Sequence, residues 1–390
     1  MPEAYIVDAI RSAGGRRNGR LASWHPADMA GEILNALVMR SRIDPAAVED
    51  VILGCVSQAG EQAFAFARNA VLASKLPSSV PAVTIDRQCG SSQQAVQFAA
   101  QAIMSGMQDV VIAAGAESMS RVPMGSNWSL HAKAGIGTGP WSERIQKRFG
   151  VQEFSQFEAA EMVARKHGLI REDLDRYALE SHRRVHAATM AGAFEREVIP
   201  LRIETSAGPA MHSHDEGIRP DASLEAISSV KLIREGGVIS AANTSQICDG
   251  ASGALIVSER ALKTHNLTPL ARVHTVTVSA GDPVIMLEEP INATRRALQR
   301  AGLSIDEIDL FEVNEAFASV PLAWINTLKA DPDKVNVNGG AIALGHPLGA
   351  SGTKLLATLI NALRTRKGRY GLQTMCEGGG IANVTIVEAL

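Results

Sequence analysis

The sequence VTIDRQCGSSQQA, residues 83–95, passes within a few residues from a β-branched run to an Ala-rich helical pattern. Its cysteine, Cys89, is therefore expected to lie where the helix begins. Unpaired backbone N–H groups and the positive end of the helix dipole favour a thiolate at that position. Gly90 and the two serines after it keep backbone N–H groups accessible. The stretch predicts a strand–turn–helix unit with a nucleophilic cysteine, although most free cysteines are small buried hydrophobic residues.

This strand–helix unit occurs twice in the chain. Residues 335–338 precede a glycine-rich loop and an apolar helical pattern, much as residues 83–86 precede Cys89 and its helix. A helical stretch that leads through an acidic turn into an apolar strand also occurs twice, at 27–53 and at 291–313. Strands that alternate with helices indicate mainly parallel sheets covered by helices on both faces. We therefore predict two similar α/β halves that pack into a layered α/β/α/β/α body.

Residues 119–247 interrupt the repeated pattern. They hold loops rich in glycine and tryptophan and a pair of charged helical stretches, with little strand character. Insertions of this size commonly serve as lids or binding arms. The predicted domains are an N-terminal half made of 1–118 and 248–269, an inserted loop domain at 119–247, and a C-terminal half at 270–390.

The composition is that of an ordinary soluble enzyme. Hydrophobic residues make up 46% of the 390 residues, charged residues 20%, and the formal net charge is -3. We therefore expect no nucleic-acid partner. No apolar run approaches the roughly 18 residues of a membrane span, and the strand-like residues 4–7 leave no room for a signal peptide, so no membrane association is expected. The four cysteines form no Cys-x-x-Cys pair, which favours free thiols and a cytoplasmic location.

Two other glycine-rich stretches carry groups that could serve Cys89. His346 lies in GHPLG, residues 345–349, where the glycines let other segments approach an imidazole that can take and return a proton near neutral pH. Cys376 ends an apolar strand and is followed by Gly378 and two more glycines, whose backbone N–H groups could form an oxyanion hole. Asn314 ends another strand, where an amide could orient a water or a carbonyl group. The simpler alternatives are a long turn around His346 and a strand-end turn at Asn314.

Two other polar clusters give weaker signals. The sequence His-Ser-His-Asp at 212–215 has metal-ligand residue types but no third ligand at regular spacing, so we expect no metal. The basic pair at 16–17 is typical of a solvated surface.

Several separated motifs together resemble those of the thiolase family, and the resemblance extends over nearly the whole chain. The motifs are DRQCGSSQQA at 86–95, VNEAFA at 313–318, NGGAIALGHPLG at 338–349 and CEGGG at 376–380. The resemblance implies an α/β, thiolase-like fold with duplicated five-layered α/β/α/β/α halves and an inserted loop domain. It also implies a homo-oligomer, either a dimer or a tetramer.

The resemblance further implies CoA-dependent cleavage of a 3-oxoacyl-CoA. Cys89, activated by His346, would attack the 3-keto carbon and carry the acyl group, while Cys376 would protonate the acetyl-CoA carbanion. In the condensing direction Cys376 would remove that proton. The backbone N–H groups of Cys89 and Gly378 would form one oxyanion hole, and His346 with a water held by Asn314 would form the second.

CoA is implied as a substrate, with no bound cofactor, and its contacts come mainly from the insertion. Ser245 matches a pantetheine-contacting serine, Arg219 an arginine near the nucleotide end, and Ala316 with Phe317 would line the thioester channel. Biosynthetic acetoacetyl-CoA thiolases carry a His-Met pair where this chain has Ser-Gln-Phe-Glu at 155–158. The resemblance thus favours a degradative enzyme for bulky, steroid-like acyl groups. Acetoacetyl-CoA synthesis and a non-catalytic lipid carrier are the alternatives, and the presence of all four chemical groups argues against the carrier.

Overall fold

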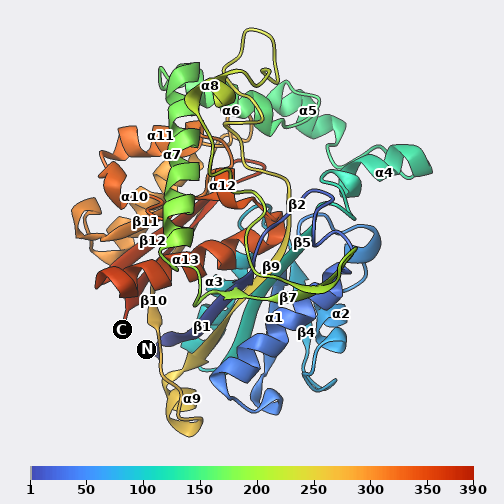
Figure 1. Ribbon diagram of the computed structural model, residues 1–390, viewed down its shortest axis with the longest axis vertical. Coiled ribbons are helices and arrows are strands. Elements are labelled where there is room, and N and C mark those ends of the chain that lie inside the picture. The colour runs from blue at the N-terminus through green and yellow to red at the C-terminus, as the bar shows by residue number, and fades with distance from the viewer. Residues whose placement is uncertain (1) are drawn as a thin grey trace.

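The computed structural model describes residues 2–390 and contains two similar α/β halves joined edge to edge (Figure 1). The strands of the N-terminal half follow the order β4–β3–β5–β9–β1, and those of the C-terminal half continue as β10–β13–β12–β11. Their bounds are Ala4–Ser12 (β1), Asp50–Gly54 (β3), Ala82–Ile85 (β4), Val110–Ser118 (β5), Cys248–Ser258 (β9), Ala271–Ala280 (β10), Leu310–Val313 (β11), Tyr370–Glu377 (β12) and Ile381–Ala389 (β13). The halves meet where β1 pairs antiparallel with β10, with Tyr5 opposite Arg272.

Both halves use the same strand pattern. In the first, β3 lies parallel to β4 and to β5, and β9 runs antiparallel between β5 and β1. In the second, β11 is parallel to β12, β13 runs antiparallel between β12 and β10, and Val335 makes a single parallel bridge to Phe311 where β4 has its counterpart. The prediction of mainly parallel sheets is therefore wrong for the inner strands. The turn at Gly378–Gly380 joins β12 to β13 as a hairpin, and a hairpin can connect only antiparallel strands.

Five layers result from the packing of helices on these sheets. Helices α3 (Ser91–Met104) and α13 (Ser351–Arg366) lie against each other in the middle layer, and each packs on strands of both halves of the sheet. Helices α1 (Pro26–Ser41) and α2 (Phe66–Ala73) cover the outer face of the first half. Helices α10 (Glu289–Ala301) and α11 (Ser319–Leu328) cover that of the second. The predicted α/β/α/β/α layering is present, and the two halves build it together by sharing the α3–α13 layer.

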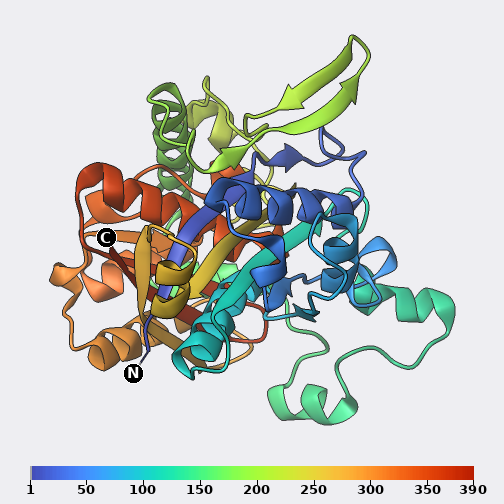
Figure 2. The same cartoon turned by 90° about the horizontal axis from the view of Figure 1, so that it is seen from below.

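The elements between β5 and β9 lie mostly outside this layered body. They are α4 (Ser126–Ala134), α5 (Glu143–Phe149), α6 (Gln156–Lys166), α7 (Arg171–Met190), α8 (Leu224–Ser228), and the strands β6 (Val198–Ile199), β7 (Leu201–Thr205) and β8 (Gly208–His212). Helices α4 and α5 stand away from the body, and the β7–β8 hairpin projects from it (Figures 1 and 2). The short strand β6 returns to pair with β1. The domain boundaries after residues 118, 247 and 269 remain a prediction.

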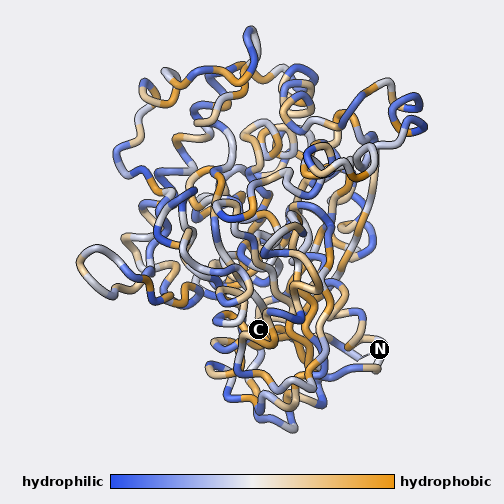
Figure 3. Tube along the Cα trace, turned by 90° about the vertical axis from the view of Figure 1, so that its right-hand side faces the viewer, coloured by the Kyte–Doolittle hydropathy of each residue, from blue (hydrophilic) through white to orange (hydrophobic). Residues whose placement is uncertain are grey.

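Hydrophobic stretches concentrate inside the layers, and hydrophilic ones in the outer helices and loops (Figure 3). The remaining short elements are β2 (Gly15–Arg16), which pairs with β9, α9 (Glu259–Thr264) and α12 (Ala341–Leu344). In the part of the chain that the structure describes, no helix combines the length and the apolar character needed to span a bilayer.

Glycines bring the His346 loop into direct backbone contact with the first half. An ideal Cβ placed on Gly352 would lie 2.0 Å from the backbone nitrogen of Gln93, at the start of α3. One placed on Gly115 would lie 2.1 Å from the carbonyl oxygen of Gly349. No side chain fits at either contact, so the separation of α3 and α13 depends on these glycines.

A methyl group at this contact should force the two central helices apart. We expect Gly352→Ala to lower the free energy of unfolding by about 2 kcal/mol or more, since overpacking a dense interior displaces backbone. Urea denaturation measures the change. The control is Thr365→Ala, at an exposed position of the same helix, which should change the stability by less than about 0.5 kcal/mol. Equal stability of the two variants would contradict the prediction.

Candidate active site

The structure places Cys89 directly before α3. Gly90 is the residue that precedes the helix, and Gln88 has a left-handed φ of 48°, which turns the chain sharply between β4 and α3. The Cys89 side chain is 8% exposed and lines a cavity of about 620 Å³. Gly378 of the β12–β13 turn lines the same cavity and packs against Gln88, with an ideal Cβ 2.9 Å from its amide oxygen. The backbone N–H groups of Cys89 and Gly378, which are predicted to form an oxyanion hole, thus belong to two turns that pack against each other.

Cys89 is nevertheless a thiol and not a thiolate in this environment. Burial raises its pKa well above the ordinary value, and the neighbouring Cys376 and Glu377 raise it further. The expectation of a thiolate favoured by the helix N-terminus near neutral pH is therefore wrong, because desolvation and two neighbouring acidic groups outweigh the helix dipole. A base must remove the proton for Cys89 to react.

His346 has the properties of that base. It lies between α12 and α13, is 3% exposed, and lines a cavity of about 790 Å³. The Ser351 hydroxyl donates to the Pro347 carbonyl oxygen at 2.9 Å, so it accepts from Nδ1–H of His346 at 2.5 Å. Nε2 therefore carries no hydrogen and can accept a proton. It lies 3.4 Å from Nδ2 of Asn314. Burial, followed by the charge of Lys354, lowers the pKa of His346 to about 3, so the imidazole is neutral.

Asn314 follows β11 and is held rigidly behind the imidazole. Its backbone N–H donates to Thr374 at 3.1 Å, and its side chain is 1% exposed. The next residue, Glu315, accepts from the Ser181 hydroxyl at 2.7 Å and from the backbone N–H of Ile342 at 3.0 Å. The Glu315 carboxylate therefore ties the end of β11 to α7 and α12, the elements that lead to His346.

Cys376 lies near the end of β12 and is 1% exposed. Burial, followed by the neighbouring Glu377, raises its pKa to about 12. An ideal Cβ on Gly90 would lie 1.9 Å from Glu377 Oε1, and the Asn383 side chain donates to the Gly90 carbonyl oxygen at 3.1 Å. The β12–β13 hairpin is thus packed directly on the turn that carries Cys89, which brings Cys376 close enough to raise the pKa of Cys89.

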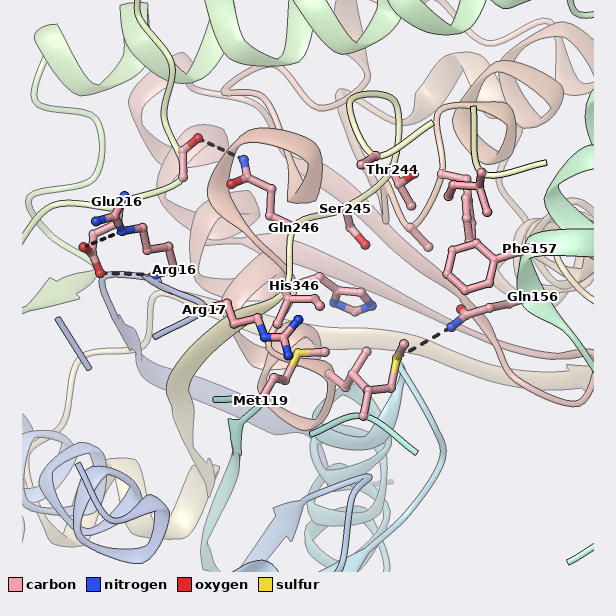
Figure 4. A pocket seen from close by; sticks show the side chains of 18 of the residues that line it. Arg16, Arg17, Met119, Gln156, Phe157, Glu216, Thr244, Ser245, Gln246 and His346 are labelled. Atoms are coloured by element: carbon pink, nitrogen blue, oxygen red, sulfur yellow. Dashed lines mark hydrogen bonds and ion pairs between the residues drawn. The ribbon is translucent and has the colours of Figure 1, made fainter. Parts of the chain in front are cut away.

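The two cavities adjoin. The cavity with Cys89 and the cavity with His346 share the side chains of Met124, Gln156, Phe157 and Leu348. The Gln156 amide lies 3.7 Å from the Met124 sulfur, and the Phe157 ring packs edge-on against Phe317 at 5.6 Å between centroids. Figure 4 shows Phe157 and Gln156 on one side of the His346 imidazole. One elongated molecule could therefore reach both catalytic groups.

All four residues predicted to contact CoA line the His346 cavity. They are Arg219, Ser245, Ala316 and Phe317. Arg16 and Arg17 line it too, with Glu216 paired to Arg16 at 3.7 Å (Figure 4). Both arginine side chains are exposed, as the sequence predicts. Their place in the cavity lining is not visible in the sequence, because the fold brings residues 16 and 216 together from distant parts of the chain.

The clustered 212–215 residues have structural partners. His212 Nε2 lies 3.2 Å from the carbonyl oxygen of Ala13, and the Asp215 carboxylate binds Arg11 at 2.8 Å. In residues 2–390 no group of three or more His, Cys, Asp or Glu side chains is arranged to hold a metal ion.

One thiol and a neutral imidazole line adjoining cavities, and a second buried thiol lies close to the first, an arrangement that suits acyl transfer. The chain belongs to the thiolase family and is an acyltransferase. Residues 4–260 match the family model for the thiolase N-terminal domain, and residues 267–389 match that for the thiolase C-terminal domain.

Similar proteins cover the whole chain. The steroid 3-ketoacyl-CoA thiolase FadA6 of Mycobacterium tuberculosis is 53% identical over 100% of this chain and 95% of its own. A 3-ketoacyl-CoA thiolase of Shewanella loihica is 40% identical over the full length of both chains. Among solved structures, human mitochondrial 3-ketoacyl-CoA thiolase superposes with a TM-score of 0.89 at 36% identity, covering 100% of this chain and 99% of that one. The Bacillus anthracis acetyl-CoA acetyltransferase superposes with a TM-score of 0.91 at 34% identity, with the same coverage.

Ser351, which sequence reasoning missed, should matter through the orientation of His346. Removing the hydroxyl in Ser351→Ala leaves Nδ1 without its partner, so the imidazole loses its fixed tautomer and we expect kcat to fall roughly 10- to 100-fold. Steady-state kinetics with CoA as the varied substrate measures the change. KM for CoA should stay nearly constant, and Ser351→Thr, which keeps the hydroxyl, should recover much of the rate. An unchanged kcat in Ser351→Ala would contradict this role.

Proposed function

We propose that the protein cleaves a 3-oxoacyl-CoA with CoA, giving acetyl-CoA and an acyl-CoA shortened by two carbons. One observation carries the proposal: Cys89 and His346 line adjoining cavities that share four side chains, while the second cysteine lies close enough to the first to raise its pKa. Relatives named 3-ketoacyl-CoA thiolase, at 40% identity or more over this whole chain, support the degradative direction.

In the first half of the proposed reaction, Nε2 of neutral His346 takes the proton of Cys89. The sulfur then attacks the 3-keto carbon, and the oxygen of that carbon receives negative charge. The backbone N–H groups of Cys89 and Gly378 stabilise this oxyanion, and each such donor is worth roughly 3 to 4 kcal/mol of barrier. The bond between C2 and C3 breaks, which leaves the acyl group on sulfur and an acetyl-CoA enolate.

In the second half, Cys376 gives its proton to C2 of the enolate. His346 and the amide of Asn314 face the enolate oxygen, and the oxygen of that amide, Oδ1, has no hydrogen-bond partner among residues 2–390. A buried unpaired acceptor suits a bound water. The protonated His346 returns its proton to the Cys376 thiolate. Neutral His346 then takes the proton of the entering CoA thiol, whose sulfur attacks the acyl carbon, and Cys89 leaves and receives that proton from His346. Each cycle thus transfers the CoA proton to acetyl-CoA and restores both thiols.

The cavity around Cys89 suits a bulky acyl group. Its volume of about 620 Å³ exceeds the needs of an acetyl group, and its walls include Trp128, Trp141, Phe154 and Met286. Flat aromatic walls favour a rigid ring system over a flexible chain. The name of the 53% identical relative points to the same class, a steroid-derived acyl group. Rates with 3-oxoacyl-CoA thioesters, from four carbons up to polycyclic acids, test this. A preference for acetoacetyl-CoA would instead favour acetoacetyl-CoA metabolism.

CoA itself would occupy the His346 cavity as a substrate, with no resident cofactor or metal. Ser245 lies near the imidazole (Figure 4), and Phe317 lines the same cavity, where the pantetheine would pass. Arg16, Arg17 and Arg219 supply positive charge for the phosphates. All four cysteines are free and buried, which supports the proposal of a reducing, cytoplasmic setting.

We also propose a homodimer or a tetramer built from such dimers, with contact through β4. This strand ends the sheet, so one of its backbone edges is available for pairing. Val83 of β4 is 46% exposed, and Phe64, which lies just before α2, is 91% exposed. The Thr84 hydroxyl of β4 accepts from the backbone N–H of Ala67 in α2, so this helix lies beside the strand. An exposed edge strand with apolar neighbours is suited to a second copy of the chain.

The roles of the two cysteines can be separated by substitution. We expect Cys89→Ala to lose acyl-enzyme formation and thiolysis entirely, because no other thiol lines that cavity with an adjacent base. We expect Cys376→Ser to be acylated at Cys89 but to lose most carbon–carbon bond chemistry, since a serine is a far weaker acid. Mass spectrometry of trapped enzyme and C2 proton exchange of acetyl-CoA measure the two steps. Robust turnover by Cys89→Ala, or normal exchange by Cys376→Ser, would refute the assignments.

The proposed interface predicts a change of assembly. Val83→Lys places a charge on the exposed edge of β4 and should convert the oligomer into smaller species, as measured by light scattering after size-exclusion chromatography. Met107→Lys, at an 80% exposed position beyond the other end of α3, is the control and should leave the assembly intact. An unchanged oligomer in Val83→Lys would place the interface elsewhere.

A further inference from the structure

A wholly buried lysine lies one helical turn beyond Ser351. The Lys354 side chain of α13 is 4% exposed, and its ammonium donates to the carbonyl oxygens of Leu344 at 2.7 Å and Gly345 at 3.0 Å. These two residues immediately precede His346 and end α12. Gly345 has a left-handed φ of 79°, so the chain turns at this point. Lys354 therefore holds both carbonyl groups of the turn that presents the imidazole.

The ammonium belongs to a cluster of four buried charges. Arg11 of β1 binds Glu197 at 2.7 Å and Asp215 at 2.8 Å, and both carboxylates also interact electrostatically with Lys354. Burial lowers the pKa of Lys354 and raises that of Glu197, while the oppositely charged members of the cluster act against both shifts. A buried charge is costly unless paired and hydrogen-bonded, so its placement beside the histidine turn calls for a function.

We propose that Lys354 is a positioning residue, which holds the turn that carries His346 and opposes a positive charge on the imidazole. This inference rests on the proposed role of His346 as the base. Since the pKa of each thiol is raised by burial, the base must start uncharged, and a protonated imidazole could accept nothing. A fixed turn also keeps Nε2 directed to Asn314, while Ser351 binds Nδ1 from the other side.

The other charged and titratable groups near the turn do not replace Lys354. Cys248 of β9 packs against Gly345, with an ideal Cβ 2.7 Å from its sulfur, and burial raises the pKa of this thiol to about 12. Glu117 of β5 accepts from the backbone N–H of Gly349 at 2.9 Å, and burial raises its pKa. Arg17 lines the cavity beside the imidazole. Burial and Lys354 are the causes that lower the pKa of His346 to about 3.

Three substitutions test the inference. Lys354→Met removes the charge and the donors, Lys354→Gln keeps a donor without charge, and Lys354→Arg keeps both. We expect Lys354→Met to slow acylation of Cys89 roughly 10- to 100-fold in rapid-quench experiments. KM for CoA should change less than about threefold. Lys354→Arg should recover most of the rate. Thr365→Ala, at an exposed position of the same helix, serves as the control with wild-type acylation.

The ionisation of His346 gives a second readout that needs no turnover. In histidine-labelled protein followed by NMR, with the resonance assigned from His346→Gln, the imidazole of the wild type should stay neutral down to acid pH. In Lys354→Gln its titration should move toward neutral pH by roughly one unit, and the acid limb of the acylation rate should move with it. If Lys354→Met does not fold, as judged by thermal denaturation, Lys354→Gln carries both measurements.

The outcomes are distinct. An unmoved imidazole titration together with wild-type acylation in the folded Lys354→Gln variant would overturn the inference. Absence of CoA-dependent cleavage in the wild-type protein would overturn the proposed function. The NMR titration would still decide whether Lys354 controls the charge of His346.

Discussion

The active site depends on a backbone contact that only glycine permits. Cys89 comes from the first half of the chain and His346 from the second, and their cavities adjoin near the start of α3 and α13. Gly352 touches the backbone of Gln93, and Gly349 touches that of Gly115. The Glu117 carboxylate then joins the two sides, because it accepts from Gly349 N–H and from the backbone of the β3 loop, each at 2.9 Å. Side chains at these positions would separate the proposed nucleophile from its proposed base.

Burial sets the chemistry of the groups so assembled. It raises the pKa of both cysteine thiols and lowers that of the histidine, so all three are uncharged at rest. A thiolate–imidazolium pair would have to exist in the same dry space, at a high desolvation cost. The proton transfers are therefore expected to accompany bond formation to the substrate, whose first oxyanion would accept from the backbone N–H groups of Cys89 and Gly378. The resting enzyme is protected from stray alkylation or oxidation for the same reason, since the thiolate is the reactive form.

Much of this could be predicted from sequence, where local motifs carry the signal. Cys89, His346 and Cys376 each lie at the end of a strand or in a loop, close to glycines. The repeated strand–helix pattern predicts the layered α/β fold. Other features depend on contacts between distant segments, and no local pattern reveals them. The Ser351 hydroxyl has meaning only once it faces His346, and the basic pair at 16–17 only once residue 216 lies beside it. The thiolate expectation failed because the helix dipole is visible in sequence, whereas the depth of burial is not.

The layered body carries the proposed reacting groups, and the insertion supplies part of the cavity wall. This separation would let one chemical site serve different acyl groups. The reacting groups lie on the inner ends of rigid strands and helices, in contacts that leave no space for a further methyl group. Half of the residues that line the proposed acyl cavity come from the insertion, where Trp128 and Trp141 stand on the α4–α5 segment with ring centroids 6.4 Å apart. Substitutions there alter the shape available to the acyl group without moving Cys89, because none of these side chains belongs to the α3–α13 contact. Substrate range and chemistry are thus carried by separate parts of the fold.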